Sequence, residues 1–380
     1  MEILKYTEEH EKYREKLRVF FEKEVTPYAD KWEEDHAVPK EVWRKVGQAG
    51  LLCPLVPEEY GGIGGDFSHV VVYMEEFAKT KQSGLMLTLH NDIVVPYILA
   101  YGTEEVKKKY LPKCVSGECI TAVAMTEPAV GSDLSGMETT AVEDGDEIII
   151  NGNKTFISNG HVSDLVIVAA RNSEIDDPYS GISLYLVEDG TPGFERGEKF
   201  DKLGMRSQDT AELFFNNCRI PKENMLGTKG GGFIMLMEKL QQERLCAAIG
   251  GVVGSEAIIK ELIEFCQKTI VDGKPLSKSQ AIRFELVEMA TEVKLGRTFM
   301  ETLIYDHIDG QNVVVETSML KSWGTDLLND HVNRALEIMG DYATLEESVL
   351  VRGFRDSRIT TIFAGTNEIM KQVAAQFMGI

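Results

Sequence analysis

The sequence predicts an α+β protein in which a helical region, a β-rich region and a second helical region follow one another. Residues 1–117 and 229–380 carry apolar side chains at helical spacing, whereas residues 118–228 hold short runs of β-branched and aromatic residues between turn signals. The chain has 380 residues, which is long for a single core. We therefore expect three domains with these boundaries.

The N-terminal region is expected to be a small helical domain. Apolar residues recur at helical spacing within 20–28 and 42–49, and prolines and glycines interrupt the pattern between 54 and 65. Two further helices are predicted over residues 68–79 and 85–101.

The middle region is expected to form a small β-sandwich or barrel. Turn pairs such as Asp144–Gly145 and Asn151–Gly152 separate its apolar runs. Short strands at this spacing are typical of a sandwich or barrel. The predicted strands cover residues 120–125, 147–150, 165–170, 182–187 and 211–215.

The C-terminal region returns to helical spacing after glycines 230–232. Long helices are predicted over residues 233–269, 278–309 and 313–339, and a shorter helix over 366–378. The sequence shows no repeat of 20–50 residues. This region is therefore expected to form a helical domain.

Charge and composition limit the classes of partner. The net charge of −21 argues against nucleic acid and anionic membranes. No window reaches about 18 apolar residues, so no membrane span is expected. The acidic N-terminus resembles neither a secretory signal nor a transit peptide, which favours a cytoplasmic protein. The six cysteines form no Cys-x-x-Cys pair and the histidines are scattered, so we expect reduced thiols and no metal site.

A strand that runs into a Pro/Gly turn is the first candidate binding segment. It contains Met125, Thr126, Gly131 and Ser132. Backbone N–H groups, small side chains and two hydroxyls at one rim suit the approach of a planar polar ring or a phosphate. The alternative is an ordinary strand-to-turn corner.

A second candidate segment covers residues 153–160 and contains Phe156 and Ser158. Taken alone, Phe156 is more typical of a core strand residue. The glycine-rich stretches 203–207 and 227–233 are weak signals of phosphate binding by themselves.

Two carboxylates stand in apolar helical patterns. Glu243 lies on the apolar, small-residue stripe of its predicted helix, where a carboxylate is costly unless it is paired or functional. An ion pair with Arg244 or a lysine is the alternative. Asp92 lies on a helix that is apolar nearly all round, and Pro96 cannot donate to the Asp92 carbonyl, so the helix is expected to open there. A hydrogen-bonded core aspartate is the alternative at this position.

The stretch from Arg355 to Met370, together with the two binding segments above, resembles the acyl-CoA dehydrogenase family. The resemblance covers essentially the whole chain. It implies an N-terminal helical domain, a middle β domain and a C-terminal four-helix bundle. It also implies FAD as cofactor, an acyl-CoA substrate, a homotetramer, and transfer of electrons to an electron-transfer flavoprotein or similar carrier.

The resemblance assigns roles to residues of both binding segments. In the family, the positions of Met125 and Thr126 contact the pyrimidine end of FAD, and that of Ser132 contacts its pyrophosphate. The aromatic at Phe156 covers the isoalloxazine, and the hydroxyl at Ser158 meets N5. Further cofactor contacts are implied for Gly131, Gln280 and Thr366.

The C-terminal signature differs from the family pattern at one position. Many members have a glutamate, their catalytic base, where this chain has Ala364. The backbone N–H at this position and a flavin hydroxyl bind the thioester oxygen in the family, so Ala364 and the following Gly365 remain thioester-binding candidates. The long-chain and isovaleryl branches also lack that glutamate and take their base from the helix of Glu243. Arg244 is expected to orient Glu243 or the CoA arm.

Two other family positions also differ. Thr269 stands where an arginine usually meets the FAD pyrophosphate of a neighbouring subunit, and Glu337 replaces a glutamine. Lys268 and Lys274 are the candidates to hold the diphosphate instead.

Asp92 raises the question of the substrate. In the family its helix lines the floor of the acyl pocket, where an acid disfavours a plain fatty chain. It suits a ring already unsaturated next to the thioester, such as cyclohex-1-ene-1-carboxyl-CoA, whose vinylogous protons are acidic. The alternatives are α,β-dehydrogenation of a short branched or medium linear acyl-CoA, and a catalytically silent flavin- or CoA-binding scaffold.

Overall fold

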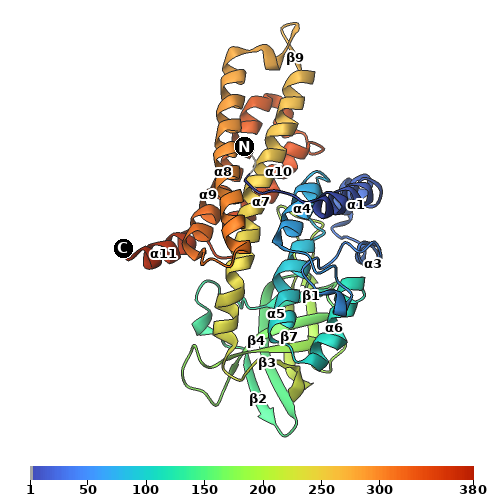
Figure 1. Ribbon diagram of the computed structural model, residues 1–380, viewed down its shortest axis with the longest axis vertical. Helices are drawn as coiled ribbons and strands as arrows, with labels where there is room; N and C mark the ends of the chain where they lie inside the picture. The colour runs from blue at the N-terminus through green and yellow to red at the C-terminus, as the bar shows by residue number, and fades with distance from the viewer. Residues whose placement is uncertain (1–2) are drawn as a thin grey trace.

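The computed structural model describes residues 3–380 and contains the three predicted regions in order (Figure 1). Helices occupy the chain up to Ser116, strands run from Thr121 to Leu226, and helices return at Gly232. The predicted fold class is confirmed. No helix among the described residues is long and apolar enough to cross a membrane.

The N-terminal region is helical, as predicted. The predicted helix over 68–79 is α4, displaced by one residue. The predicted helix over 85–101 is instead composite, because a π-helical turn, Leu89–Val94, precedes the last two turns. The helices are α1 (Glu8–Glu24), α2 (Ala29–Asp35), α3 (Lys40–Gln48), α4 (Phe67–Ala78), α5 (Val95–Tyr101) and α6 (Glu104–Ser116).

Pro96 accounts for the π-helical turn. It has no N–H to offer to the Asp92 carbonyl, and the Val95 N–H donates to His90 five residues back. The Asp92 carbonyl accepts instead from Gln242 Nε2 at 2.6 Å. The predicted opening of the helix is therefore present. The Gln242 side chain, from the C-terminal region, supplies the hydrogen-bond donor that the Asp92 carbonyl lacks within its own helix.

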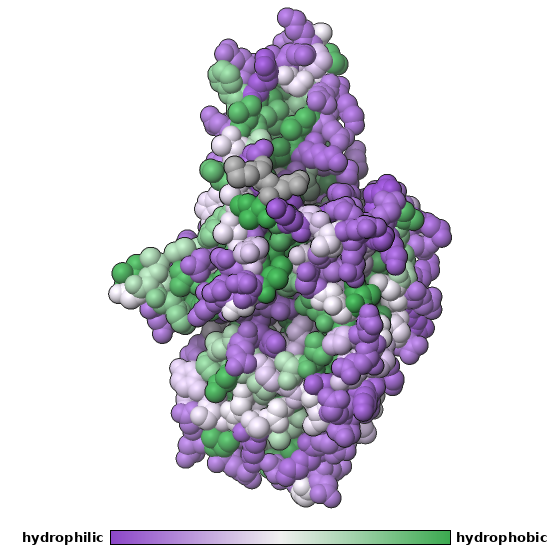
Figure 2. All heavy atoms as spheres, in the orientation of Figure 1, coloured by the Kyte–Doolittle hydropathy of each residue, from purple (hydrophilic) through white to green (hydrophobic). Residues whose placement is uncertain are grey.

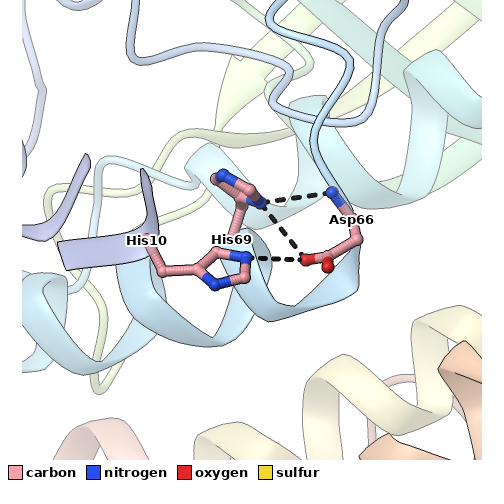
Figure 3. A group of neighbouring side chains, drawn as sticks. All are labelled: His10, Asp66 and His69. Atoms are coloured by element: carbon pink, nitrogen blue, oxygen red, sulfur yellow. Dashed lines mark hydrogen bonds and ion pairs between the residues drawn. The ribbon is translucent and has the colours of Figure 1, made fainter. Parts of the chain in front are cut away.

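Two histidines far apart in the sequence join the starts of α1 and α4 (Figure 3). Each helix begins with a capping box whose third residue is a histidine: His10 accepts from the Thr7 N–H and His69 from the Asp66 N–H. His10 Nε2 lies 3.0 Å from Asp66 Oδ1 and links the two caps. The arrangement is explained by helix capping, which holds α1 against α4.

The middle region is one sheet with the strand order β6-β7-β3-β2-β4-β5-β8, and β1 pairs with β4 in parallel. All five predicted strands are present. β3 and β7 extend well beyond the predicted ranges. The bounds are β1 Thr121–Ala124, β2 Thr140–Asp144, β3 Glu147–Ser158, β4 Leu165–Asn172, β5 Ile182–Glu188, β6 Phe194–Lys199, β7 Thr210–Pro221 and β8 Met225–Leu226.

One edge of β4 is shared by two strands, which folds the sheet. β1 pairs with residues 165–168 and β2 with Arg171 and Asn172. Alternate residues of β1, β3, β4 and β7 thereby meet in one apolar core. The other faces of β4 and β5 pack against the helices, so both strands are buried on both sides.

The C-terminal region is dominated by three long helices, α7 (Gly232–Lys268), α8 (Gln280–Ile308) and α9 (Val314–Met339). A Cβ at Gly251 would lie 2.7 Å from the Gly324 backbone, so glycine lets α7 and α9 touch. The hairpin of β9 (Ile270–Val271) and β10 (Lys274–Pro275) caps one end. The fourth helix of the apolar core at this end is α10 (Val349–Ser357), whereas α11 (Asn367–Met378) projects outward (Figure 1).

The bridge between Gln242 and the Asp92 carbonyl can be tested by replacing Gln242 with leucine. The Gln242→Leu variant leaves a buried carbonyl without a donor, so we expect the free energy of unfolding to fall by about 1–3 kcal/mol. Urea unfolding of the flavin-loaded protein measures this change. The matched control is Gln241→Leu on the same helix, since the Gln241 side chain makes no hydrogen bond within residues 3–380. Equal stability of the two variants would contradict the assignment.

Candidate active site

Asp92 is a buried acid with one free oxygen. Its side chain is 1% exposed. The Tyr73 hydroxyl donates to Oδ2 and also lies 2.6 Å from the Thr88 hydroxyl. Oδ1 has no partner within residues 3–380. Burial raises the pKa of Asp92 to about 8, although the Tyr73 hydrogen bond opposes the rise. The alternative of a fully hydrogen-bonded core aspartate therefore does not hold.

Glu243 is the second acid, and it lies on α7 next to the residue that bridges to Asp92. Its Oε2 is buried and unpartnered among the described residues. Burial raises the pKa of Glu243 to about 7, while the charges of Arg244 and Lys321 lower it. No basic group in residues 3–380 forms an ion pair with its carboxylate. The ion-pair alternative is thus wrong for this conformation.

Tyr97 and Cys246 are two buried side chains whose pKa values respond to the charges of Asp92 and Glu243. Both side chains are buried. A charge on Glu243 helps to raise the pKa of Tyr97, and charges on both acids help to raise that of Cys246, after burial as the main cause. Both acids therefore belong to one desolvated environment.

This environment contains a group of polar atoms that lack partners. Buried polar groups in folded proteins are nearly always hydrogen-bonded, so such a group marks a place that receives a polar ligand or water. Within residues 3–380 its members are Asn91 Nδ2, Asp92 Oδ1, Tyr97 Oη, Glu243 Oε2 and Arg244 Nε.

The turn before α11 lies against the Glu243–Arg244 step. Ala364 and Gly365 both have positive φ, +54° and +88°. The Ala364 N–H has no acceptor among the described residues. Arg244 Nε lies 3.9 Å from the point where a Cβ at Gly365 would stand. The structure thus brings together the predicted thioester-binding residues and one predicted base.

Thr366 and Lys321 fix this turn. Thr366 caps α11, since its hydroxyl accepts from the Ile369 N–H at 3.3 Å. Lys321 Nζ donates to the Gly365 carbonyl at 2.7 Å. Lys321 was not identified from the sequence, and the one signal for it is a lysine on an apolar, small-residue face of a predicted helix.

The first flavin segment is held by a buried ion pair. Lys154 Nζ donates to the Met125 carbonyl at 3.0 Å and to Glu127 at 2.8 Å. Glu127 also accepts the N–H groups of residues 138 and 139. The Thr155 N–H donates to the Thr126 carbonyl at 3.0 Å. Met125 and Thr126 are therefore fixed beside β3, while the following Gly131 and Ser132 are exposed.

Phe156 of the second segment points out of the sheet. Its φ is +55° at a bulge between β3 and β7, and its side chain is 67% exposed. The alternative of a core strand residue is wrong, because the bulge turns the ring outward. The ring stacks on Phe200, and Ser158 is half-buried at the end of β3. A strained, exposed aromatic beside hydroxyl groups fits the face of a flavin.

Gln280 is not brought to the other flavin residues. It begins α8, directly after the β9–β10 hairpin, at the end of the bundle opposite the β domain (Figure 1). Lys268 ends α7 just before the same hairpin and pairs with Glu264, whereas Lys274 lies within the hairpin as the first residue of β10. These side chains therefore lie away from the other flavin-binding candidates of the same chain (Figure 1).

Comparison with known proteins assigns the chain to a family. The acyl-CoA dehydrogenase N-terminal, middle and C-terminal domain models match residues 7–118, 122–218 and 230–379. The chain is 40% identical to the long-chain specific acyl-CoA dehydrogenase, mitochondrial, of Rattus norvegicus, over 98% of this chain and 86% of the relative.

Solved structures agree with this assignment. An acyl-CoA dehydrogenase from Geobacillus kaustophilus is 47% identical, with a TM-score of 0.96 over 99% of both chains. A chain in the structure described as electron transferring flavoprotein of Acidaminococcus fermentans is 32% identical, with a TM-score of 0.94 over 99% of both chains. A catalytically silent scaffold therefore finds no support. The chain belongs to the acyl-CoA dehydrogenase family, and it is an FAD-dependent oxidoreductase that acts on the CH–CH groups of acyl-CoA thioesters.

Proposed function

We propose that this acyl-CoA dehydrogenase oxidises a cyclic acyl-CoA whose ring already carries a double bond next to the thioester, such as cyclohex-1-ene-1-carboxyl-CoA. The observation that carries the proposal is Asp92, a second buried acid with a free oxygen, in addition to Glu243. A saturated fatty chain has no acidic proton beyond the α carbon for this oxygen to remove, whereas the ring has vinylogous γ protons within the reach of a base.

The proposed reaction is a 1,4-elimination across the ring. Asp92 Oδ1 takes a proton from the γ carbon, the electron pair shifts through the ring double bond, and a hydride leaves from the ring carbon on the other side of the thioester-bearing carbon. The product is a conjugated cyclic diene, and FAD, when bound, would supply the acceptor for the hydride and with it for both electrons of the oxidation. A base with a pKa near 8 is well matched to proton removal near neutral pH.

The thioester is proposed to lie at the turn before α11. The Ala364 N–H stabilises the negative charge that develops on the thioester oxygen when the proton leaves. Gly365 keeps this approach open, and Arg244 adjoins the turn and binds or orients the CoA thioester. The cofactor is proposed to contact Met125, Thr126, Gly131, Ser132, Phe156, Ser158 and Thr366, with Gln280 contributed by another copy of the chain.

The second candidate is α,β-dehydrogenation of a short branched or medium linear acyl-CoA with Glu243 as base. The pKa of Glu243, about 7, favours this role. The relative of Rattus norvegicus is named for long-chain substrates, which is consistent with a linear acyl chain. The two roles are compatible, because each acid can serve a different proton.

We also propose a homotetramer that passes electrons to an electron-transfer flavoprotein or a similar carrier. Large apolar side chains are exposed on α8 and α11, among them Phe284, Leu295 and Phe377. Figure 2 shows apolar residues over the bundle and on the projecting α11. Such surfaces are typical of subunit contacts. The resemblance to a chain in the structure described as electron transferring flavoprotein of Acidaminococcus fermentans supports the proposal that such a flavoprotein is the electron acceptor. The cytoplasmic location and the exact domain boundaries stay predictions from the sequence.

Replacing each acid by its amide separates the two candidate reactions. Asp92→Asn is expected to slow bleaching of the flavin by cyclohex-1-ene-1-carboxyl-CoA by about 10²–10⁴-fold, because the base is lost. Glu243→Gln is expected to slow linear and branched substrates by a similar factor. Anaerobic stopped-flow absorbance with a panel of linear, branched and cyclic acyl-CoAs measures both effects.

The control for these variants is Glu9→Gln, the same chemical change at an exposed position of α1, which should leave every rate unchanged. Full turnover of the cyclic substrate by Asp92→Asn would refute the ring hypothesis. Loss of all activity in Glu243→Gln alone would leave Glu243 as the base for every substrate.

The raised pKa of Asp92 also predicts how stability depends on pH. An unfolded aspartate loses its proton near pH 3.9, about four pH units below the folded value of about 8. Between these values the folded state holds a proton that the unfolded state has lost, so stability falls as the pH rises. Asp92→Asn removes this component. We expect the advantage of the variant over the wild type to be larger at pH 8.5 than at pH 5, where only about one of the four pH units has been crossed.

Urea midpoints of the flavin-saturated proteins at both pH values measure this difference. A midpoint difference that does not change with pH would show that Asp92 is ionised throughout in the folded protein.

A further inference from the structure

Lys321 of α9 is a fully buried lysine that forms no ion pair within residues 3–380. Its Nζ donates to the Gly365 carbonyl at 2.7 Å and to Asn367 Oδ1 at 3.0 Å. A buried ammonium is costly unless its donors are satisfied. Here the charge-assisted hydrogen bonds go to the backbone and side chain of one turn, which is an unusual use of a buried cation.

The Asn367 side chain is itself fixed from α9. Its amide donates to the Ser322 carbonyl at 3.1 Å and to Asp326 at 2.8 Å, and the Thr325 hydroxyl donates to its Oδ1 at 3.1 Å. The turn is therefore held at two points, the Gly365 carbonyl and the Asn367 side chain. Lys321 is the group that contacts both.

The held turn has a conformation that side chains rarely adopt. Ala364 lies at φ +54° and is followed by Gly365 at +88°. A non-glycine residue in this region persists only where its surroundings enforce it. The Gly365 carbonyl belongs to the peptide unit that follows Gly365, so fixing it limits rotation about the bonds that set the direction of the Ala364 N–H.

The charged groups around Lys321 do not provide a competing explanation. Burial lowers its pKa to about 8, and Asp326, Glu368 and Glu243 act on it only at longer range, with Arg244 opposing them. None of these carboxylates accepts a hydrogen bond from Nζ in the described part of the chain. The hydrogen bonds of the Lys321 ammonium within residues 3–380 therefore go to the Gly365 carbonyl and to Asn367.

We propose that Lys321 is a positioning residue for thioester activation: by holding the Gly365 carbonyl and Asn367, it keeps the Ala364 N–H directed at the thioester oxygen. The inference rests on the proposed role of the Ala364 N–H. It does not depend on whether Asp92 or Glu243 removes the proton.

The test uses Lys321→Met, which keeps the length of the side chain but removes its donors, and Lys321→Gln, which restores a neutral N–H donor. The probe is an aryl-acryloyl-CoA, whose absorbance moves to longer wavelength when its thioester carbonyl is polarised by hydrogen bonds. The flavin-loaded proteins are titrated with this probe, and kcat and KM are measured with the best substrate of the wild type. Lys371→Met, on the exposed face of α11, is the control for the chemical change.

Lys321→Met is expected to bind the probe without its spectral shift and to lose about 10²-fold in kcat with little change in KM, because a small misplacement of a catalytic donor has this effect. Lys321→Gln is expected to recover most of the shift and of the rate. Lys371→Met should match the wild type in both.

A purely structural role for Lys321 would lower the thermal unfolding temperature but leave the shift intact in the folded fraction, and that result would overturn the proposal. If Lys321→Met does not fold, Lys321→Gln decides, because its side chain is one bond shorter and cannot reach both acceptors as lysine does. A shift and a rate below those of the control variant in a stable, flavin-loaded protein support the proposal, and values equal to those of the control overturn it. Absence of the shift in the wild type would instead refute the role of the Ala364 N–H itself.

Discussion

The missing N–H of Pro96 is the constraint on which the site depends. It leaves the Asp92 carbonyl without its helical donor, and Gln242 of α7 supplies one from a part of the chain 150 residues away. This hydrogen bond ties the N-terminal helices to the bundle at one point. Because Glu243 follows Gln242 directly, the same contact places the second acid near the first. A proline that would otherwise only break a helix is therefore part of the contact that joins the two acid-bearing elements.

Desolvation then gives both acids their chemical character. Among residues 3–380 each has one oxygen without a partner, and burial raises the pKa values of both toward neutrality. A carboxylate on the surface would be a weaker base at neutral pH, and one in an ion pair would be weaker still. Burying two acids without full hydrogen bonding lowers the stability of the fold. This cost is typical of functional sites, where activity and stability compete.

The fold and part of the site could be predicted from the sequence, because they depend on local patterns. The helical interruption at Pro96 follows from the chemistry of one residue. The Gln242 bridge does not, since it depends on how two distant helices pack. The sequence pattern around Phe156 is typical of a core strand residue, whereas in the structure a bulge turns its side chain outward. Lys321 lies on an apolar, small-residue face of its helix, but its contact with the turn before α11 depends on how α9 and α11 pack. Gln280 matches a flavin motif, but it begins α8 at the end of the bundle away from the β domain, and a linear motif does not reveal that distance.

The positions of the two acids relative to the turn before α11 support different reactions for each. Arg244 adjoins Gly365, so Glu243, its neighbour in sequence, lies at the thioester end of the site. Asp92 lies on a separate element that reaches α7 through Gln242 and makes no hydrogen bond to the turn within residues 3–380. Under the proposed function, a proton beside the thioester carbonyl is therefore assigned to Glu243, and a proton further along the acyl group to Asp92. With alanine at 364, the turn carries no carboxyl side chain of its own, and the proposal makes the structure of the acyl group decide which acid acts.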